Sequence, residues 1–159
     1  MLIKADIASF AVDPEQNLPI LILKESGGER TLPILIGSTE ASAIAIKSLN
    51  IVSDRPLTID LVRAVMTDLG GTLRRVVVND LIDSVFYAQL YIAVGKSMHI
   101  IDCRSSDAIA LALRCECDIF VEDSVFEKND KTHYLTYKEK LRKNIADLDT
   151  LDFGRYYLE

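Results

Sequence analysis

The decapeptide GSTEASAIAI at residues 37–46 returns 67 residues later, without a gap, as RSSDAIALAL at residues 104–113. Four positions are identical in the two copies, and Glu40 is matched by Asp107. An apolar run precedes each copy, LPILI at residues 32–36 and MHIID at residues 98–102. Each copy therefore predicts a strand that leads into a helix with a carboxylate in its first turn. The repeat suggests a duplicated unit with two related sites.

The remaining pattern places a hairpin before each of these helices. Strands are expected at residues 2–12, 18–24, 30–36, 72–79, 84–94, 98–102 and 118–121, with turns at 13–17, 25–29 and 80–83. Helices are expected at residues 38–49, 58–69 and 106–115. The sequence thus predicts one compact α+β domain over residues 1–126, a mixed β-sheet with packed helices built from two similar hairpin-plus-helix units.

Further details of the helices follow from their side chains. Hydroxyl residues are the expected N-caps: Ser38 or Thr39 for the first helix, Thr58 for the second, and Ser105 or Ser106 for the third. The second helix is expected to bury an apolar stripe made of Leu57, Leu61, Ala64, Val65 and Leu69. Residues 127–159 are expected to form a polar C-terminal tail with a short amphipathic helix, whose apolar face carries Leu141, Ile145 and Leu148.

Composition narrows the classes of protein to be considered. The formal net charge is −6 and the pI is about 5.0, which argues against a broad basic face for nucleic acid. No apolar run approaches the ~20 residues of a membrane helix, and the N-terminus does not resemble a signal peptide. Three cysteines, an odd number, argue against a disulfide framework and favour the cytoplasm. No P-loop or dinucleotide-binding glycine loop is present, so no organic cofactor is expected.

The densest polar cluster is Asp102-Cys103-Arg104-Ser105-Ser106-Asp107. A turn of this composition can offer backbone N–H groups, hydroxyls and a guanidinium to a phosphate, and Asp102 and Asp107 could hold a divalent metal. The structural alternative is that a serine caps the helix, Asp107 complements its dipole and Arg104 pairs with Asp102.

A second cluster, Arg55-Pro56-Leu57-Thr58-Ile59-Asp60, precedes the second helix. Arg55 and Thr58 are candidate substrate-binding residues, and Asp60, with Glu40, is a candidate metal ligand. A salt bridge and a helix cap would explain the same residues without a ligand. No Ser-His-Asp or Cys-His nucleophile set can be assembled around His99 and His133.

Taken in order, these clusters resemble the bifunctional nuclease domain family. The similarity lies in LPILIG with Glu40-Ala41, RPLT with Asp60-Leu61, Phe86-Tyr87-Ala88, and the segment from Asp102 to Ala112, over about residues 2–126. The family often has His where this chain has Ile59, and Pro where it has Ser105. The resemblance implies hydrolysis of phosphodiester bonds in DNA and RNA.

Two functional hypotheses remain open. The first is a nuclease that uses Mg²⁺ or Mn²⁺, with Asp102, Asp107, Asp60 and Glu40 as ligands or base, and Arg104, Arg55, Thr58, Ser105 and Ser106 around the phosphate. The second is a non-catalytic regulatory or scaffold module that self-associates and binds a small anionic ligand or a protein. Nucleic acid is the expected partner of the first, and a homodimer is expected in both.

Overall fold

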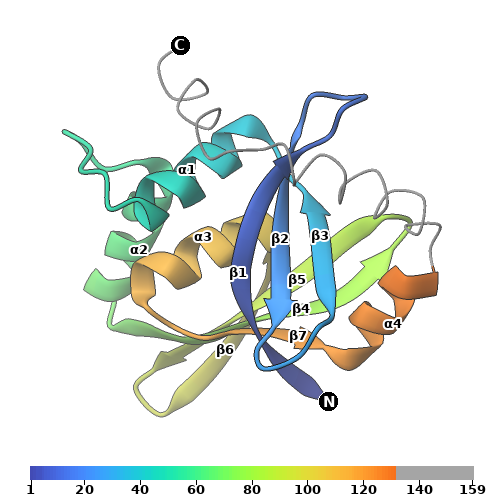
Figure 1. The fold of residues 1–159 in the computed structure, drawn as a ribbon. Coiled ribbons are helices and arrows are strands. Elements are labelled where there is room, and N and C mark those ends of the chain that lie inside the picture. The colour runs from blue at the N-terminus through green and yellow to red at the C-terminus, as the bar shows by residue number, and fades with distance from the viewer. Residues whose placement is uncertain (132–159) are drawn as a thin grey trace.

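Seven strands and four helices make up residues 1–131, the part of the chain that this computed structural model describes (Figure 1). The strands are β1 (Leu2–Val12), β2 (Pro19–Glu25), β3 (Thr31–Leu35), β4 (Gly71–Ile82), β5 (Val85–Val94), β6 (Ser97–Arg104) and β7 (Ile119–Glu122). The helices are α1 (Ser38–Ser48), α2 (Thr58–Asp68), α3 (Ser105–Cys115) and α4 (Asp123–Lys131). None of these helices is long and apolar enough to cross a bilayer. The predicted α+β class is confirmed.

All seven strands belong to one sheet in the order β3-β2-β1-β7-β4-β5-β6. Strands β1–β3 and β4–β6 are two antiparallel meanders, and β7 joins them by pairing antiparallel to β1 and parallel to β4. The last strand of each meander is a sheet edge and is followed in the chain by a helix, α1 or α3. A strand pair followed by a helix therefore occurs twice, although a common origin of the two units stays a prediction.

Helix α3 is central to the core. Eight of its eleven residues are buried, and Figure 1 shows it crossing the inner side of the curved sheet, where it contacts β4 and β5. Helix α1 packs against α3 and buries Ala41, Ile44 and Ala45. Alanines at these positions let two helix backbones approach closely, because they fill little space between the helices. The two helices that carry the repeated alanine pattern thus pack against each other.

The predicted helix caps are wrong. The N-cap residues are Gly37 for α1, Leu57 for α2 and Arg104 for α3, and none of them caps its helix with a side chain. Strand β6 runs into α3 without an intervening residue, so Ser105 and Ser106 already lie in the buried first turn. The α2 terminus is closed instead by Asp60, whose Oδ2 accepts the Leu57 N–H at 2.8 Å.

The predicted turn at residues 80–83 is also displaced. Strand β4 continues to Ile82, and the hairpin turns through Asp83 and Ser84, which have φ angles of 48° and 64°. Two consecutive left-handed residues are the geometry of a tight two-residue hairpin loop. Burial of Leu81 beside Phe86 extends the ladder past the polar residues that suggested an earlier turn.

Helix α2 differs most from the sequence prediction. None of its residues is buried, and Leu61, Val65 and Leu69 of the expected stripe are exposed. The helix rests on the core through Ile59 and Met66 instead. Helical spacing correctly predicted an amphipathic helix, but it could not determine which neighbour covers the apolar face.

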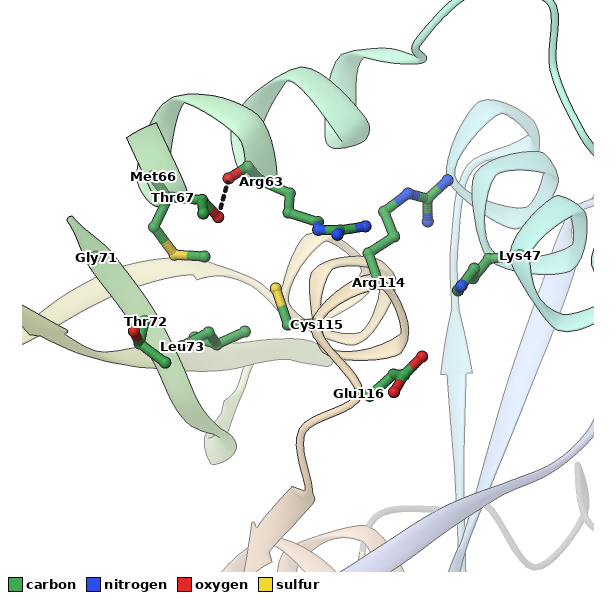
Figure 2. Close-up of a pocket in the computed structure, with 10 residues that line it drawn as sticks. All are labelled: Lys47, Arg63, Met66, Thr67, Gly71, Thr72, Leu73, Arg114, Cys115 and Glu116. Carbon is green, nitrogen blue, oxygen red and sulfur yellow. Dashed lines mark hydrogen bonds between the residues drawn. The ribbon is translucent and has the colours of Figure 1, made fainter. Parts of the chain in front are cut away.

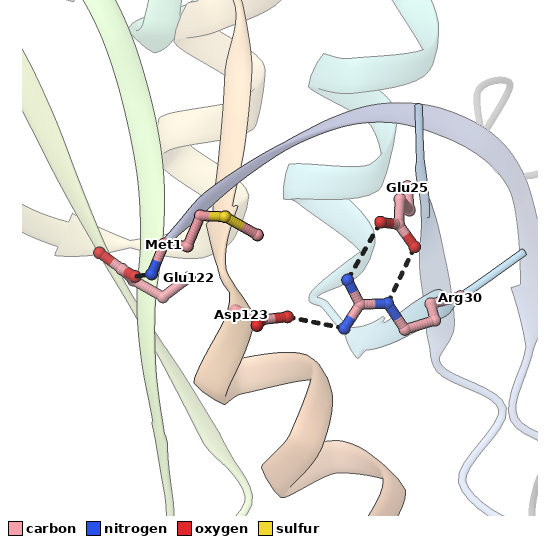
Figure 3. A network of polar contacts seen from close by, with 5 residues as sticks. All are labelled: Met1, Glu25, Arg30, Glu122 and Asp123. Carbon is pink, nitrogen blue, oxygen red and sulfur yellow. Dashed lines mark hydrogen bonds and ion pairs between the residues drawn. The ribbon is translucent and has the colours of Figure 1, made fainter. Parts of the chain in front are cut away.

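Arg30 connects helix α4 to the β2–β3 hairpin (Figure 3). The Arg30 guanidinium binds both carboxylate oxygens of Glu25, at 2.8 and 3.0 Å, and Asp123 at 2.7 Å, and it also lies over the Phe126 ring. The expected domain boundary at residue 126 falls inside this helix. Residues 132–159, which include the predicted amphipathic helix of the tail, lie outside the described residues.

Candidate functional site

The two repeat junctions meet at one guanidinium. Arg104, at the end of β6, donates from Nε and Nη2 to the two carboxylate oxygens of Asp107, at 2.7 and 3.1 Å. Its Nη1 lies 3.0 Å from Oε1 of Glu40, in the first turn of α1. The matched carboxylates of the two decapeptides are therefore bridged by Arg104, and the predicted pairing of Arg104 with Asp102 is not found.

The charges of this cluster are only partly balanced. The hydrogen bond and charge of Asp107, followed by the charge of Glu40, raise the pKa of Arg104, so the guanidinium remains protonated. One cation faces two carboxylates, and each carboxylate lies in the first turn of a helix, where the helix dipole favours negative charge. The Arg104 side chain is 67% exposed, so a ligand can reach it.

An apolar cavity of about 600 Å³ lies beside the charged cluster, bounded by α1, α2, α3, β5 and β6. Arg104, Glu40 and Asp107 line it together with Thr58 and Ser106. The apolar part of the wall includes Ala43, Ile46, Ile59, Val62, Leu90, Cys103, Ala110 and Leu111. A cleft of this size with a few charged groups is typical of a small-molecule site.

A smaller cavity of about 380 Å³ is also bordered by Arg104 and Glu40. Ser105 and Ser106 line it, together with Phe86 and the end of β3. Both serines are buried in the first turn of α3. Of the predicted site residues, Glu40, Arg104, Asp107, Thr58, Ser105 and Ser106 thus lie around two adjoining cavities.

The other three predicted residues lie apart from this cluster. Arg55 is exposed in the segment before α2 and lines neither cavity. Asp102 pairs across the sheet with Gln89, whereas its neighbour Cys103 faces the core and lines the larger cavity. Because successive strand residues point to opposite faces, Asp102 points away from that cavity. Asp60 faces Arg114.

Sequence analysis did not single out Arg114. Its side chain is 3% exposed, and its Nε donates to Oδ1 of Asp60 at 2.5 Å. Its other nitrogens donate to the carbonyl oxygens of Ala110 in α3 and Ala43 in α1, both at 3.1 Å. Arg114 therefore joins three helices around the larger cavity. The sequence feature that could have identified Arg114 is its spacing of seven residues from Asp107, which places both residues on one side of α3.

The ion pair with Arg114 keeps Asp60 charged. Burial raises the pKa of Asp60, but the hydrogen bonds from Arg114 and the Leu57 N–H and the charges of Arg114 and Arg63 lower it, so the pKa lies below its ordinary value. Asp60 is therefore a poor candidate for a metal ligand, because binding a metal would separate its carboxylate from Arg114 and leave the buried guanidinium charge unpaired.

No group of three or more His, Cys, Asp or Glu side chains in residues 1–131 is placed to hold a metal ion. Glu40 and Asp107 are the two candidate ligands that share one site. Mg²⁺ is commonly bound through one or two carboxylates, with water and substrate phosphates completing its shell. This pair therefore fits a substrate-associated Mg²⁺ or Mn²⁺, whereas Asp60 and Asp102 do not join it.

A separate polar pocket of about 340 Å³ lies at the other end of α3 (Figure 2). Lys47, Arg63 and Arg114 line it from three helices, together with Glu116. Asp60 already balances Arg114, and Lys47 lies in the last turn of α1, where a cation complements the helix dipole. Much of the positive charge of this pocket is therefore compensated by the protein itself.

The fold and the cavities define a small α+β domain with a charged cluster at the paired N-termini of two helices. The chain belongs to the bifunctional nuclease domain family, whose model matches residues 21–133. An uncharacterized protein of Mycobacterium tuberculosis (strain ATCC 25618 / H37Rv) is 40% identical over 119 residues, which are 75% of this chain and 71% of that protein. The family resemblance noted in the sequence is confirmed.

Two plant relatives are named bifunctional nuclease 1. Bifunctional nuclease 1 of Oryza sativa subsp. japonica is 28% identical over 120 residues, 74% of this chain, and bifunctional nuclease 1 of Arabidopsis thaliana is 28% identical over 128 residues, 78% of this chain. Each match spans 36% of the plant protein.

Proposed function

We propose that the chain is a nuclease that hydrolyses phosphodiester bonds of DNA and RNA at the cluster of Glu40, Arg104 and Asp107. The observation that carries the proposal is the convergence of two carboxylates on one exposed guanidinium at the edge of a cavity. Family membership supports the reaction class. The cluster supplies the side-chain types that phosphodiester hydrolysis requires.

Each charged side chain of the cluster has its own role in the proposed reaction. Arg104 binds the non-bridging phosphate oxygens and offsets the negative charge that grows there during the reaction. Glu40 and Asp107 would hold Mg²⁺ or Mn²⁺, and one of the two carboxylates would accept a proton from the attacking water. When bound, such an ion would polarise the phosphate and lower the pKa of water. Thr58 and Ser106 offer hydroxyls along the same wall.

Ile59 bears on the identity of the base. It lies on the α2 wall of the larger cavity, at a position where the family often has His. This chain therefore has no imidazole at that place in the wall, and the role of base passes to a carboxylate. A carboxylate base predicts activity that persists below the pKa of a histidine, about 6.5, where a histidine base would be protonated.

The test is cleavage of single-stranded DNA and RNA by the purified full chain with Mg²⁺, with Mn²⁺ or with chelator. The variant Glu40→Gln/Asp107→Asn is expected to lose metal-dependent cleavage. Glu29→Gln/Asp68→Asn is the matched control, because it changes two exposed carboxylates outside the cavities in the same way. Asp102→Asn tests the remaining sequence candidate and is expected to retain activity.

Equal cleavage by the Glu40/Asp107 variant and its control would exclude this site. Loss of activity in Asp102→Asn alone would move the reaction to the other face of β6. Absence of cleavage by the native chain under every condition would favour the second function.

That second function is a binding module for a small ligand with an apolar body and an anionic end. The large apolar wall of the 600 Å³ cavity favours it, because a phosphodiester alone would not occupy such a surface. In both functions we propose a cytoplasmic homodimer; the three free cysteines support the location.

A further inference from the structure

The exposed side of α2 is the largest discrepancy between the amphipathic pattern and the fold. Leu61, Val62, Val65 and Leu69 are exposed on a helix that buries none of its residues. An amphipathic surface helix normally turns such a stripe toward a core. An exposed stripe of this kind marks a surface that another element covers.

Neighbouring segments extend the apolar surface. Sixteen large hydrophobic residues are exposed in the described part of the chain, and ten of them lie on the α1–α2 connection, on α2 and on β6. Besides Leu61, Val62, Val65 and the C-cap residue Leu69, these are Leu49, Ile51, Val52, Met98, Ile100 and Ile101. Ile101 alternates with Cys103 along β6 and lies on the helix side of the sheet, whereas Met98 and Ile100 lie on the outer side with Asp102. Val62 of α2 and Cys103 of β6 line the same cavity, and Figure 1 shows these segments on one side of the molecule. We call the surface formed by the exposed apolar residues of α2, of the α1–α2 connection and by Ile101 the α2–β6 face.

The free edge of β6 indicates what can cover this face. Strand β6 is eight residues long and pairs only with β5, so one edge of its backbone has no strand partner among the described residues. It contains no proline and no lysine between Ser97 and Arg104. Proteins commonly protect an open edge with such residues, because unpaired N–H and C=O groups recruit another strand.

The opposite edge of the sheet is protected in this way. Strand β3 has five residues, contains Pro33, and is contacted by α4. Proline removes a backbone donor and disfavours further pairing. Pairing of β6 with β3 of another copy would also extend the sheet from copy to copy without closing, whereas pairing of β6 with itself closes after two copies.

We propose that a second copy of this chain covers the α2–β6 face, with the two β6 strands paired antiparallel about a two-fold axis perpendicular to the sheet. That axis keeps the helices of both copies on one side of the joined sheet, so the exposed stripes of α2 flank the new strand pair. The surface is then isologous, as most dimer interfaces are. The proposal goes beyond the nuclease function and does not depend on it.

The interface also reaches the candidate site. Val62 is exposed on the α2–β6 face and lines the larger cavity at the same time. The partner copy therefore lies beside the cavity wall formed by α2. Dimerisation is expected to restrict access to that wall without supplying the charged groups of the cluster.

The test is the mass of the full chain by size-exclusion chromatography with light scattering, over a series from 1 to 100 µM. The native chain is expected at twice its mass of 17.7 kDa. Ile101→Lys places a charge on the free strand, on the side that α2 flanks, and is expected to give a monomer. Val85→Lys is the matched control, because Val85 is also a β-branched strand residue, is 55% exposed against 47% for Ile101, and lies outside the face.

Val65→Lys tests whether α2 takes part, and circular dichroism verifies that each variant is folded. Hydrogen exchange adds a measurement that does not depend on substitution: amides of β6 are expected to gain protection as the native chain is concentrated, and amides of β3 are not. A native monomer at 100 µM would overturn the proposal and leave the face to residues 132–159 or to another protein. A dimer that survives both Ile101→Lys and Val65→Lys would overturn it as well.

Discussion

Arg104 and Glu40 form an ion pair of 3.0 Å between residues that are 64 positions apart in the chain. Glu40 lies in the first turn of α1, the helix of the first copy, and Arg104 is the N-cap of α3, the helix of the second copy. The two related junctions therefore share one site rather than forming two. This relationship is why the predictions for catalysis concentrate on Arg104 and its two carboxylates.

Replacement of Arg104 by Gln should impair function far more than stability. The side chain is 67% exposed, and exposed ion pairs contribute about 0–1 kcal/mol, so the free energy of unfolding should change by no more than that. Loss of a cation that stabilises charge in the transition state typically lowers kcat by about 10²-fold or more. Cleavage rates and urea unfolding of the same preparation measure both effects.

Arg74→Gln is the control for this variant, because Arg74 is exposed and lines none of the cavities described. It removes the same charge from the chain. If both variants lose activity equally, Arg104 acts only through the overall charge of the protein, and its assigned contact with phosphate is wrong.

Replacement of Asp60 by Asn should destabilise the domain strongly. The variant leaves the buried guanidinium of Arg114 without its anion, and breaking a buried pair typically costs about 3–5 kcal/mol. Asp60 itself is 35% exposed, so we expect about 2–3 kcal/mol after allowance for solvent screening. Asp68→Asn, on the exposed end of the same helix, should change the free energy of unfolding by less than about 0.5 kcal/mol.

The same pair predicts a pH dependence. The pKa of Asp60 is lower in the folded chain than in the unfolded chain, so the unfolded state binds the proton more readily. Its stabilising contribution is therefore complete above the unfolded pKa of about 3.9 and is lost as the pH falls through the folded value. The stability difference between native protein and Asp60→Asn should be constant from pH 6 to 8 and shrink below pH 4. A difference that grows on acidification would contradict the assignment.

The sequence predicted the elements of this domain better than their contacts. Strand and helix types follow from local period and from turn residues, and these sufficed for the class of the sheet and for the helix after each hairpin. The parallel pairing of β7 with β4 inserts a late strand between two meanders, and no local pattern specifies that position. The exposure of Leu61 and Val65 likewise depends on what covers α2, which lies beyond the local pattern.

The sequence predicted the residue types of the candidate site, but only partly which of these residues lie together. Glu40 and Asp107 occupy matching positions of a repeat, so their similarity could be seen in the sequence. Asp107 meets Arg104 three residues along the chain, whereas the approach of Glu40 to Arg104 depends on the packing of α1 against α3. Asp102 was grouped with Asp107 because they are close in the chain, yet strand alternation turns Asp102 to the other face.

The three cysteines should react slowly with a thiol reagent while the chain is folded. Burial raises the pKa of Cys103 to about 12 and that of Cys117 to about 11, and it raises the pKa of Cys115 as well. Because only the thiolate is nucleophilic, Cys103 should react at least about 10²-fold more slowly at pH 7.5 than an unfolded cysteine. Ellman's reagent, applied to native and urea-unfolded protein, measures the ratio.

Cys103→Ser identifies the contribution of the thiol in the cavity wall. If removal of Cys103 abolishes the fastest phase of labelling in the folded chain, that thiol is accessible and ionised, and the assignment of Cys103 to the apolar wall of the cavity is wrong. If the slowest phase disappears, the cavity wall is as described.

Arg30→Met should weaken the attachment of α4 to the β2–β3 hairpin. Arg30 pairs with Glu25 through two hydrogen bonds and with Asp123 through a third, and its guanidinium lowers the pKa of Glu25. Its removal leaves two carboxylates facing an apolar side chain, and we expect a measurable decrease in the free energy of unfolding. Arg30→Lys should recover only part of this loss, because an ammonium group cannot form the two-pronged contact with Glu25.

Lys24→Met provides the comparison, since Lys24 pairs with Glu29 at 3.6 Å on the surface of the same hairpin. Exposed pairs of this kind contribute little, and the expected change is below about 0.5 kcal/mol. Because α4 contributes the buried Val125 and Phe126 to the core, hydrogen exchange of α4 should accelerate in Arg30→Met and remain unchanged in Lys24→Met. Equal protection of α4 in both variants would mean that apolar packing alone holds this helix and that the arginine is dispensable.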